Sequence, residues 1–96
     1  MIDRRFDIRI PRADALMLSW TDQAGQKHQN PAHLVDVSAS GASIRLQHPI
    51  RVGTTLSFGF DDKEFSGRVT HCVAQNLGYT LGVEFLAGYR WSPRLD

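Results

Sequence analysis

The sequence predicts an all-β domain, folded as a small antiparallel barrel or sandwich. Two observations support this prediction. About six segments alternate apolar and polar residues with the two-residue period of a strand, and turn-forming residues separate them at short spacing. Segments with helical periodicity are scarce, and 96 residues suffice for one domain but not for two.

The first three predicted strands lie in the N-terminal half of the chain. Residues Ala15–Thr21 (ALMLSWT) form the first, and the polar segment DQAGQKHQNP after it predicts a turn region, because it contains a glycine and a proline. Residues His33–Ser38 (HLVDVS) form the second strand. Residues Ala42–Gln47 (ASIRLQ) form the third, because an isoleucine and a leucine alternate with polar side chains.

The last three predicted strands complete the domain. Residues Thr54–Phe60 (TTLSFGF) carry a leucine and two phenylalanines on one face, which we expect in the core. The tight connection DDK leads into Glu64–Gln75 (EFSGRVTHCVAQ), where a phenylalanine, two valines and His71 are predicted to share a face. After the turn NLG, residues Tyr79–Phe85 (YTLGVEF) form the last strand.

The two ends of the chain differ from the barrel, which is predicted to span residues 13–86. Residues 1–12 are predicted to form a flexible arm that becomes ordered when a ligand binds. Pro11 has no N–H to donate and limits strand pairing there. Residues 87–96 form a short tail in which a glycine and a proline disfavour a helix. We expect Trp91 to pack against the barrel, because burial of so large an apolar side chain is favourable.

The positive charge of the chain is concentrated in the arm. The net charge is +1, yet residues 1–12 contain four arginines and only two aspartates. Arginine presents a planar fork that pairs with phosphate or with a guanine edge, and a flat face that stacks. The alternative is that residues 1–12 are simply a solvated terminus, which explains the same charges. A general DNA- or RNA-binding protein carries a broader basic face, so we expect no nucleic-acid polymer as a partner.

Several functional classes lack support in the sequence. The GxSxG, P-loop and HExxH motifs are absent, so we expect no enzyme, and the acidic residues Asp61, Asp62 and Glu64 are interpreted as a solvated turn. The four histidines are scattered, so we expect no metal site. We also expect no transmembrane segment and no signal peptide. The single cysteine, Cys72, is predicted to be a half-buried structural thiol and fits a cytoplasmic location.

The stretch DVSASG, from Asp36 to Gly41, ends the second predicted strand. Asp36 and Ser38 are two residues apart, so they are predicted to point from the same strand face. An aspartate within a strand is unusual, and Gly41 allows a ligand or a neighbouring backbone to approach closely. These residue types are also common in turns, so the stretch alone can simply build the connection.

Two stretches together resemble the signature of the PilZ domain family. The pattern RxxxR at Arg5 and Arg9 is followed about 30 residues later by DxSxxG from Asp36 to Gly41. The segments GRV at residues 67–69 and LGVEF at residues 81–85 are similar to the last two strands of the family. Many members carry a C-terminal helix that this chain is not expected to have. The resemblance implies a six-stranded antiparallel PilZ-type β-barrel.

The resemblance also implies binding of cyclic di-GMP, a bacterial second messenger with two phosphates and two guanines. In the family both arginines of RxxxR contact the ligand, which carries over to Arg5 and Arg9. The aspartate accepts hydrogen bonds from guanine, which carries over to Asp36. The serine contacts a phosphate or a base and the glycine leaves room, which carries over to Ser38 and Gly41.

Two further residues are predicted to bear on the ligand. Arg4 precedes RxxxR, and in the family an arginine there accompanies two stacked, intercalated ligand molecules per domain, so we expect two here. His71 is interpreted either as a core or rim histidine or as a base contact, because the family often places a large residue near this point.

The expected partner is an unidentified effector protein, and the oligomeric state stays open between a monomer and a homodimer. One alternative is a PilZ-like interaction adaptor that binds no nucleotide. Another is a barrel that binds single-stranded nucleic acid. It is disfavoured because the aromatic residues alternate as core residues and lysine is scarce.

Overall fold

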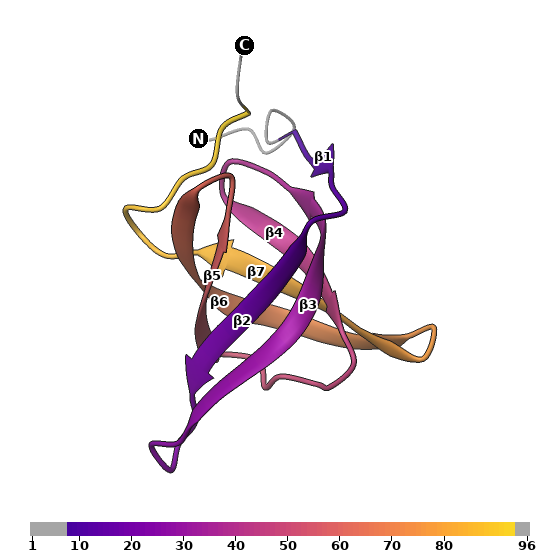
Figure 1. The fold of residues 1–96 in the computed structure, drawn as a ribbon, viewed down its shortest axis with the longest axis vertical. Coiled ribbons are helices and arrows are strands. Elements are labelled where there is room, and N and C mark those ends of the chain that lie inside the picture. The colour runs from indigo at the N-terminus through magenta and orange to yellow at the C-terminus, as the bar shows by residue number, and fades with distance from the viewer. Residues whose placement is uncertain (1–7, 94–96) are drawn as a thin grey trace.

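Six antiparallel strands close into a barrel in the computed structural model, which describes residues 8–93 (Figure 1). The two-residue strand β1 (Ile10–Pro11) precedes β2 (Ala15–Thr21), β3 (Lys27–Val37), β4 (Gly41–Leu46), β5 (Thr55–Phe60), β6 (Lys63–Gln75) and β7 (Gly78–Phe85). The pairing order is β3–β2–β5–β6–β7–β4, and β4 also pairs with β3, which closes the ring. The predicted six-stranded antiparallel barrel is therefore confirmed. Within residues 8–93 there is no helix that could span a membrane.

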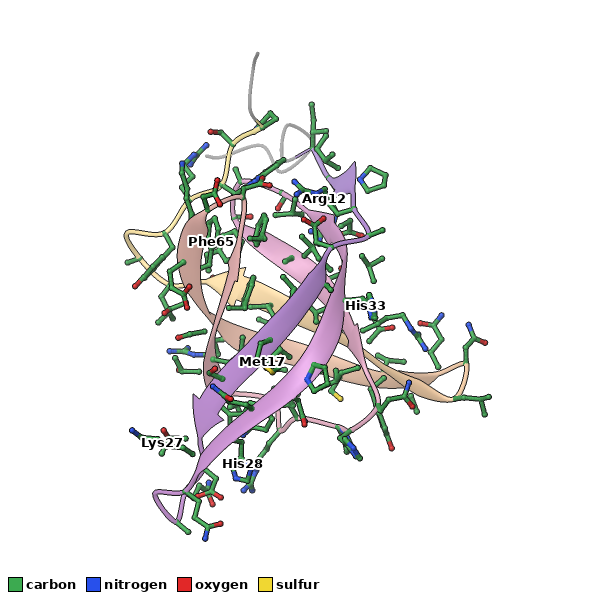
Figure 2. The ribbon with its side chains drawn as sticks, in the orientation of Figure 1. Arg12, Met17, Lys27, His28, His33 and Phe65 are labelled. Carbon is green, nitrogen blue, oxygen red and sulfur yellow. The ribbon has the colours of Figure 1, made fainter. Side chains whose placement is uncertain are left out.

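The barrel interior is filled by the apolar side chains of the alternating strands. Phe58, Phe60, Phe65 and Phe85 are all buried, and their ring centroids lie 4.6 to 6.3 Å apart, within the range that aromatic pairs favour. Figure 2 shows Phe65 toward the end of the barrel that carries β1. Trp91 is only 4% exposed and packs 6.5 Å from the Phe60 ring, so its predicted packing against the barrel is confirmed.

Strand β3 is longer than predicted. The polar segment expected to be a turn region contains only a short turn, and β3 already begins at Lys27. It runs through Pro31, which pairs with Met17 of β2. Proline is tolerated here because this part of β3 has a free edge. Among the described strands it pairs only with β2, and pairing with β4 starts at His33.

Two β-bulges interrupt the alternation from which the strand faces were predicted. In β3 the register with β4 shifts beyond Leu34, so that Leu34 and Val37 are both buried. In β6 the register with β7 shifts beyond Val69, which is buried, whereas His71 and Val73 are exposed. The predicted common face of these three residues is therefore wrong, and His71 is not a core histidine.

A hydrogen-bonded ion cluster fastens both ends of the described chain to the turn between β5 and β6. Arg12 donates to Asp61 at 2.7 and 3.0 Å and to Asp14 at 2.7 and 2.8 Å. The indole N–H of Trp91 donates to Asp61 at 3.0 Å. Asp61 is thus not the solvated turn residue that was predicted. Hydrogen bonds to Asp61 and Asp14 raise the pKa of Arg12, and its guanidinium lowers the pKa of Asp14.

This cluster lies at the end of the barrel where β1 and the tail come together. Figure 1 shows β1 and the tail at one end and the β2–β3 hairpin at the other, and Figure 2 places Arg12 and His28 toward these opposite ends. The hairpin of β6 and β7 extends sideways from the barrel (Figure 1). Residues 10–12 were predicted as part of a flexible arm. Strand β1 pairs with β3, and the amide of Arg12 donates to the Val35 carbonyl at 2.8 Å, so these residues are attached to the barrel.

Candidate functional site

An open groove of about 1100 Å³ lies where the arm, three strands and the tail meet. Four parts of the chain line it: Arg9, residues 39–43 at the start of β4, residues 70–71 of β6, and residues 82–90 of β7 and the tail. Arg9, Gly41 and His71, which were predicted as ligand-binding residues, all line this groove. Arg4 and Arg5 lie outside the described residues.

Arg9, which lines the groove, contacts Asp36, which is not among the lining residues. The Nε of Arg9 donates to Asp36 Oδ1 at 2.8 Å, and its Nη2 donates to the Ser43 hydroxyl at 3.1 Å. Strand β1 brings Arg9 to this place because it pairs with β3 beside Asp36. The two side chains are 46% and 27% exposed, so their ion pair contributes little to stability. Within residues 8–93, Nη1 of Arg9 has no partner, which leaves two N–H donors for a ligand.

Ser38 has a different environment from Asp36. It is fully buried, its hydroxyl donates to the Gly41 carbonyl at 3.4 Å, and the Ser40 amide donates to it at the same distance. Ser38 therefore closes the turn between β3 and β4 and does not line the groove. The hydroxyl that accompanies Arg9 belongs to Ser43, which sequence reasoning missed. The register of β3 with β4, which pairs Ser43 with Asp36, is the signal that identifies it.

Gly41 is required by the approach of a neighbouring strand. It pairs with Glu84 of β7, and a Cβ at Gly41 would collide with the backbone carbonyl of Val83. Of the two explanations that the sequence left open for this glycine, close approach of a ligand or of a neighbouring backbone, the structure supports the second.

His71 lies on the groove surface, where a second glycine leaves room for its ring. The bulge in β6 pairs His71 with Gly82, and a Cβ at Gly82 would overlap the imidazole ring. The Thr70 hydroxyl donates to the Gly82 carbonyl at 3.1 Å, which holds the bulge against β7. Because His71 is exposed and lines the groove, its imidazole can contact a molecule bound there.

Three further side chains of the groove were not singled out from the sequence: Glu84, Tyr89 and Arg90. Glu84 lies in β7, whereas Tyr89 and Arg90 lie in the tail, which carries no recognisable motif and is attached to the barrel by the burial of Trp91. Cys72 is a free thiol, partly buried against the core as predicted. Within the part of the chain that the structure describes, no three His, Cys, Asp or Glu side chains gather into a metal site.

The PilZ domain family model matches residues 3–89, which include all six barrel strands and every described residue of the groove except Arg90. The chain belongs to the PilZ domain family. No match was found among curated proteins.

Solved PilZ structures share the fold of this PilZ domain. It is similar to the PilZ domain of YcgR from Escherichia coli with c-di-GMP, with a TM-score of 0.66 and 13% identity, covering 88% of this chain and 79% of that one. The K. pneumonia MrkH–c-di-GMP complex has a TM-score of 0.66 at 14% identity, covering 92% of this chain and 47% of that one. The YcgR–c-di-GMP complex from Escherichia coli has a TM-score of 0.65 at 15% identity, covering 90% and 39%. The chain thus spans less than half of the latter two.

Proposed function

We propose that this PilZ domain is a bacterial cytoplasmic receptor for cyclic di-GMP and regulates a separate effector protein when the ligand binds. The contact of the groove residue Arg9 with Asp36 carries the proposal. The Nη1 donors of Arg9 suit a phosphate or the O6/N7 edge of guanine, and Asp36 accepts from guanine N–H groups. The three solved structures described above are complexes with c-di-GMP, which supports this choice of ligand.

The size and surface of the groove support a large, flat ligand. Its volume of about 1100 Å³ slightly exceeds the range of ~300–1,000 Å³ usual for small-molecule sites. We propose that Arg5 joins Arg9 on the phosphates, and that Arg4 accompanies a second, intercalated ligand molecule. His71 stacks on a base, since aromatic rings that line a groove favour such contacts. Ser38 and Gly41 act by holding the turn that shapes the groove.

Regulation needs no chemical step. The ligand favours the state of the domain that it binds best, and the ordered arm together with the ligand forms a new surface that the effector recognises. Ordering the arm costs conformational entropy, which the charged and stacked contacts must exceed. The effector therefore responds to the concentration of the ligand through the population of the closed state.

Isothermal titration with cyclic di-GMP tests the proposal. The parent chain is expected to bind two ligand molecules, and Arg9→Ala is expected to lose about 1–3 kcal/mol, the contribution of one bidentate arginine contact. Arg51→Ala is the matched control, because Arg51 is also exposed but does not line the groove. Absence of heat from the parent at tens of micromolar ligand rejects the receptor function. One ligand per chain rejects the role given to Arg4.

An adaptor that binds no nucleotide is the second candidate. The observation that favours it is the same ion pair, because Asp36 already accepts a hydrogen bond from Arg9 without a ligand. Capture of a partner protein on immobilised domain distinguishes the two functions. An adaptor retains its partner equally with and without cyclic di-GMP, whereas a receptor gains or loses it when the ligand is added.

A further inference from the structure

The C-terminal tail forms a fixed part of the groove. Tyr89 and Arg90 line the groove and are exposed, Tyr89 by 40%. The next residue, Trp91, is buried, and its indole N–H donates to Asp61 at 3.0 Å. Its amide also donates to the Ala39 carbonyl at 3.2 Å. The tail is therefore attached to the barrel immediately after the two groove residues.

A turn holds the same two residues from the other side. The Leu86 amide donates to the Ser66 carbonyl at 2.9 Å, and the Tyr89 amide donates back to the Leu86 carbonyl at 3.1 Å. Gly88 has a φ of 93°, which a glycine adopts without strain and other residues rarely do. Tyr89 and Arg90 thus lie between a closed turn and a buried tryptophan, so their backbone positions are defined before a ligand arrives.

The guanidinium of Arg90 is available for an anion. Two of the described arginines line the groove, and of these Arg9 is hydrogen-bonded to Asp36 and Ser43. Arg90 has no hydrogen-bond or ion-pair partner among residues 8–93. An exposed guanidinium without a partner keeps its donors for phosphate oxygens, and a tyrosine beside it offers an aromatic face for a base.

We propose that Tyr89 and Arg90 form a second set of ligand contacts, with Arg90 on a phosphate and Tyr89 stacked on a base. The inference rests on the proposed function and adds two residues that belong to neither the RxxxR motif nor the DxSxxG motif. A cyclic dinucleotide has two phosphates and two bases, so the arm and the tail can each hold one set. Arg12, three residues after Arg9, and Trp91, directly after Arg90, both bind Asp61, which makes this carboxylate the common support of the two sets.

Titration calorimetry with cyclic di-GMP tests the inference on the full chain. Arg90→Ala and Tyr89→Leu are each expected to weaken binding about tenfold, within the range for a lost arginine or stacking contact. Tyr89→Phe keeps the ring and should stay within about twofold of the parent. Arg51→Ala removes an exposed arginine outside the groove and should leave the affinity unchanged. The melting temperature of each free variant is measured alongside.

The outcomes separate this inference from the proposed function. If the parent binds and Arg9→Ala is weakened while Arg90→Ala and Tyr89→Leu match the parent, the tail contacts are rejected and the receptor function stands. If the parent binds nothing, both are rejected. If a variant binds more weakly and its free form also has a lower melting temperature, the effect is assigned to attachment of the tail. The proposed direct contact with the ligand is then rejected.

Discussion

Replacement of Asp61 should destabilise the barrel without any change in its core. Asp61 and Asp62 form the two-residue turn between β5 and β6, with φ angles of 53° and 58°, as a type I′ hairpin requires. Asparagine adopts this left-handed backbone readily. Asp61→Asn therefore preserves the turn and the size of the side chain, and removes only the charge and one acceptor oxygen.

The expected loss follows from the hydrogen bonds of the carboxylate. Asp61 accepts two bonds from Arg12, at 2.7 and 3.0 Å, and one from Trp91, at 3.0 Å. The carbonyl oxygen of asparagine can accept from one of these donors. Its amide N–H groups then face the remaining donors and make no hydrogen bond with them. Hydrogen bonds to a charged group contribute about 1.5–3 kcal/mol each. Arg12 keeps Asp14 and water reaches the site, where Asp61 is 21% exposed, so we expect a total loss of about 2 kcal/mol.

Urea and thermal unfolding, followed by circular dichroism and tryptophan fluorescence, measure this loss. For a domain of this size, 2 kcal/mol lowers the melting temperature by about 8–16 °C. Glu64→Gln is the matched control, because it removes a carboxylate charge from an exposed side chain close to the same turn. If the two variants differ in unfolding free energy by less than about 0.5 kcal/mol, the shared carboxylate has no structural role. Additive costs of Asp61→Asn and Trp91→Phe would equally exclude a hydrogen bond between the two residues.

Three further perturbations have defined outcomes. Gly82→Ala should displace the His71 imidazole, seen as shifted ring resonances by NMR, at a cost below about 1 kcal/mol because the exposed ring can rotate. Leu77→Gly should raise the melting temperature, since Leu77 has a φ of 65°, is 99% exposed, and its replacement removes about 1 kcal/mol of backbone strain. Asp22→Asn should lower the melting temperature at neutral pH. This deficit should shrink in acid, because hydrogen bonds from His28 and the turn amides lower the pKa of Asp22. A carboxyl with a lowered folded-state pKa stabilises above its ordinary value near 3.9 and loses that effect as the pH falls through the folded-state value.

Each of these perturbations has its own control. Gly41→Ala is the counterpart of Gly82→Ala: its Cβ would meet the backbone of Val83, which cannot rotate away, so it should unfold the domain far more easily. Leu77→Ala retains the strained backbone, and a stabilisation equal to that of Leu77→Gly would refute the role of φ. A melting-temperature deficit of Asp22→Asn that is the same at pH 3 as at pH 7 would refute the carboxylate's contribution.

The sequence by itself determined the class of fold and most of its core. Alternation of apolar residues depends only on the two-residue period of a strand, so it identified six strands and the buried phenylalanines before any pairing was known. The motifs RxxxR and DxSxxG also resembled the PilZ family signature. They are recognised from residue types and spacing along the chain, which do not depend on the fold. Trp91 was predicted to pack against the barrel from its size alone.

The tertiary structure decided which residues meet. A β-bulge depends on the register with a partner strand, so alternation wrongly assigned the face of His71 and did not anticipate that Leu34 and Val37 would both be buried. Closure of the barrel brings Asp61 to Arg12 and Trp91, three residues whose separation in sequence carries no sign of contact. The groove arises from the same closure. It joins an arginine of the arm to a tail without a motif, since only packing and hydrogen bonds over long sequence distances bring these segments together.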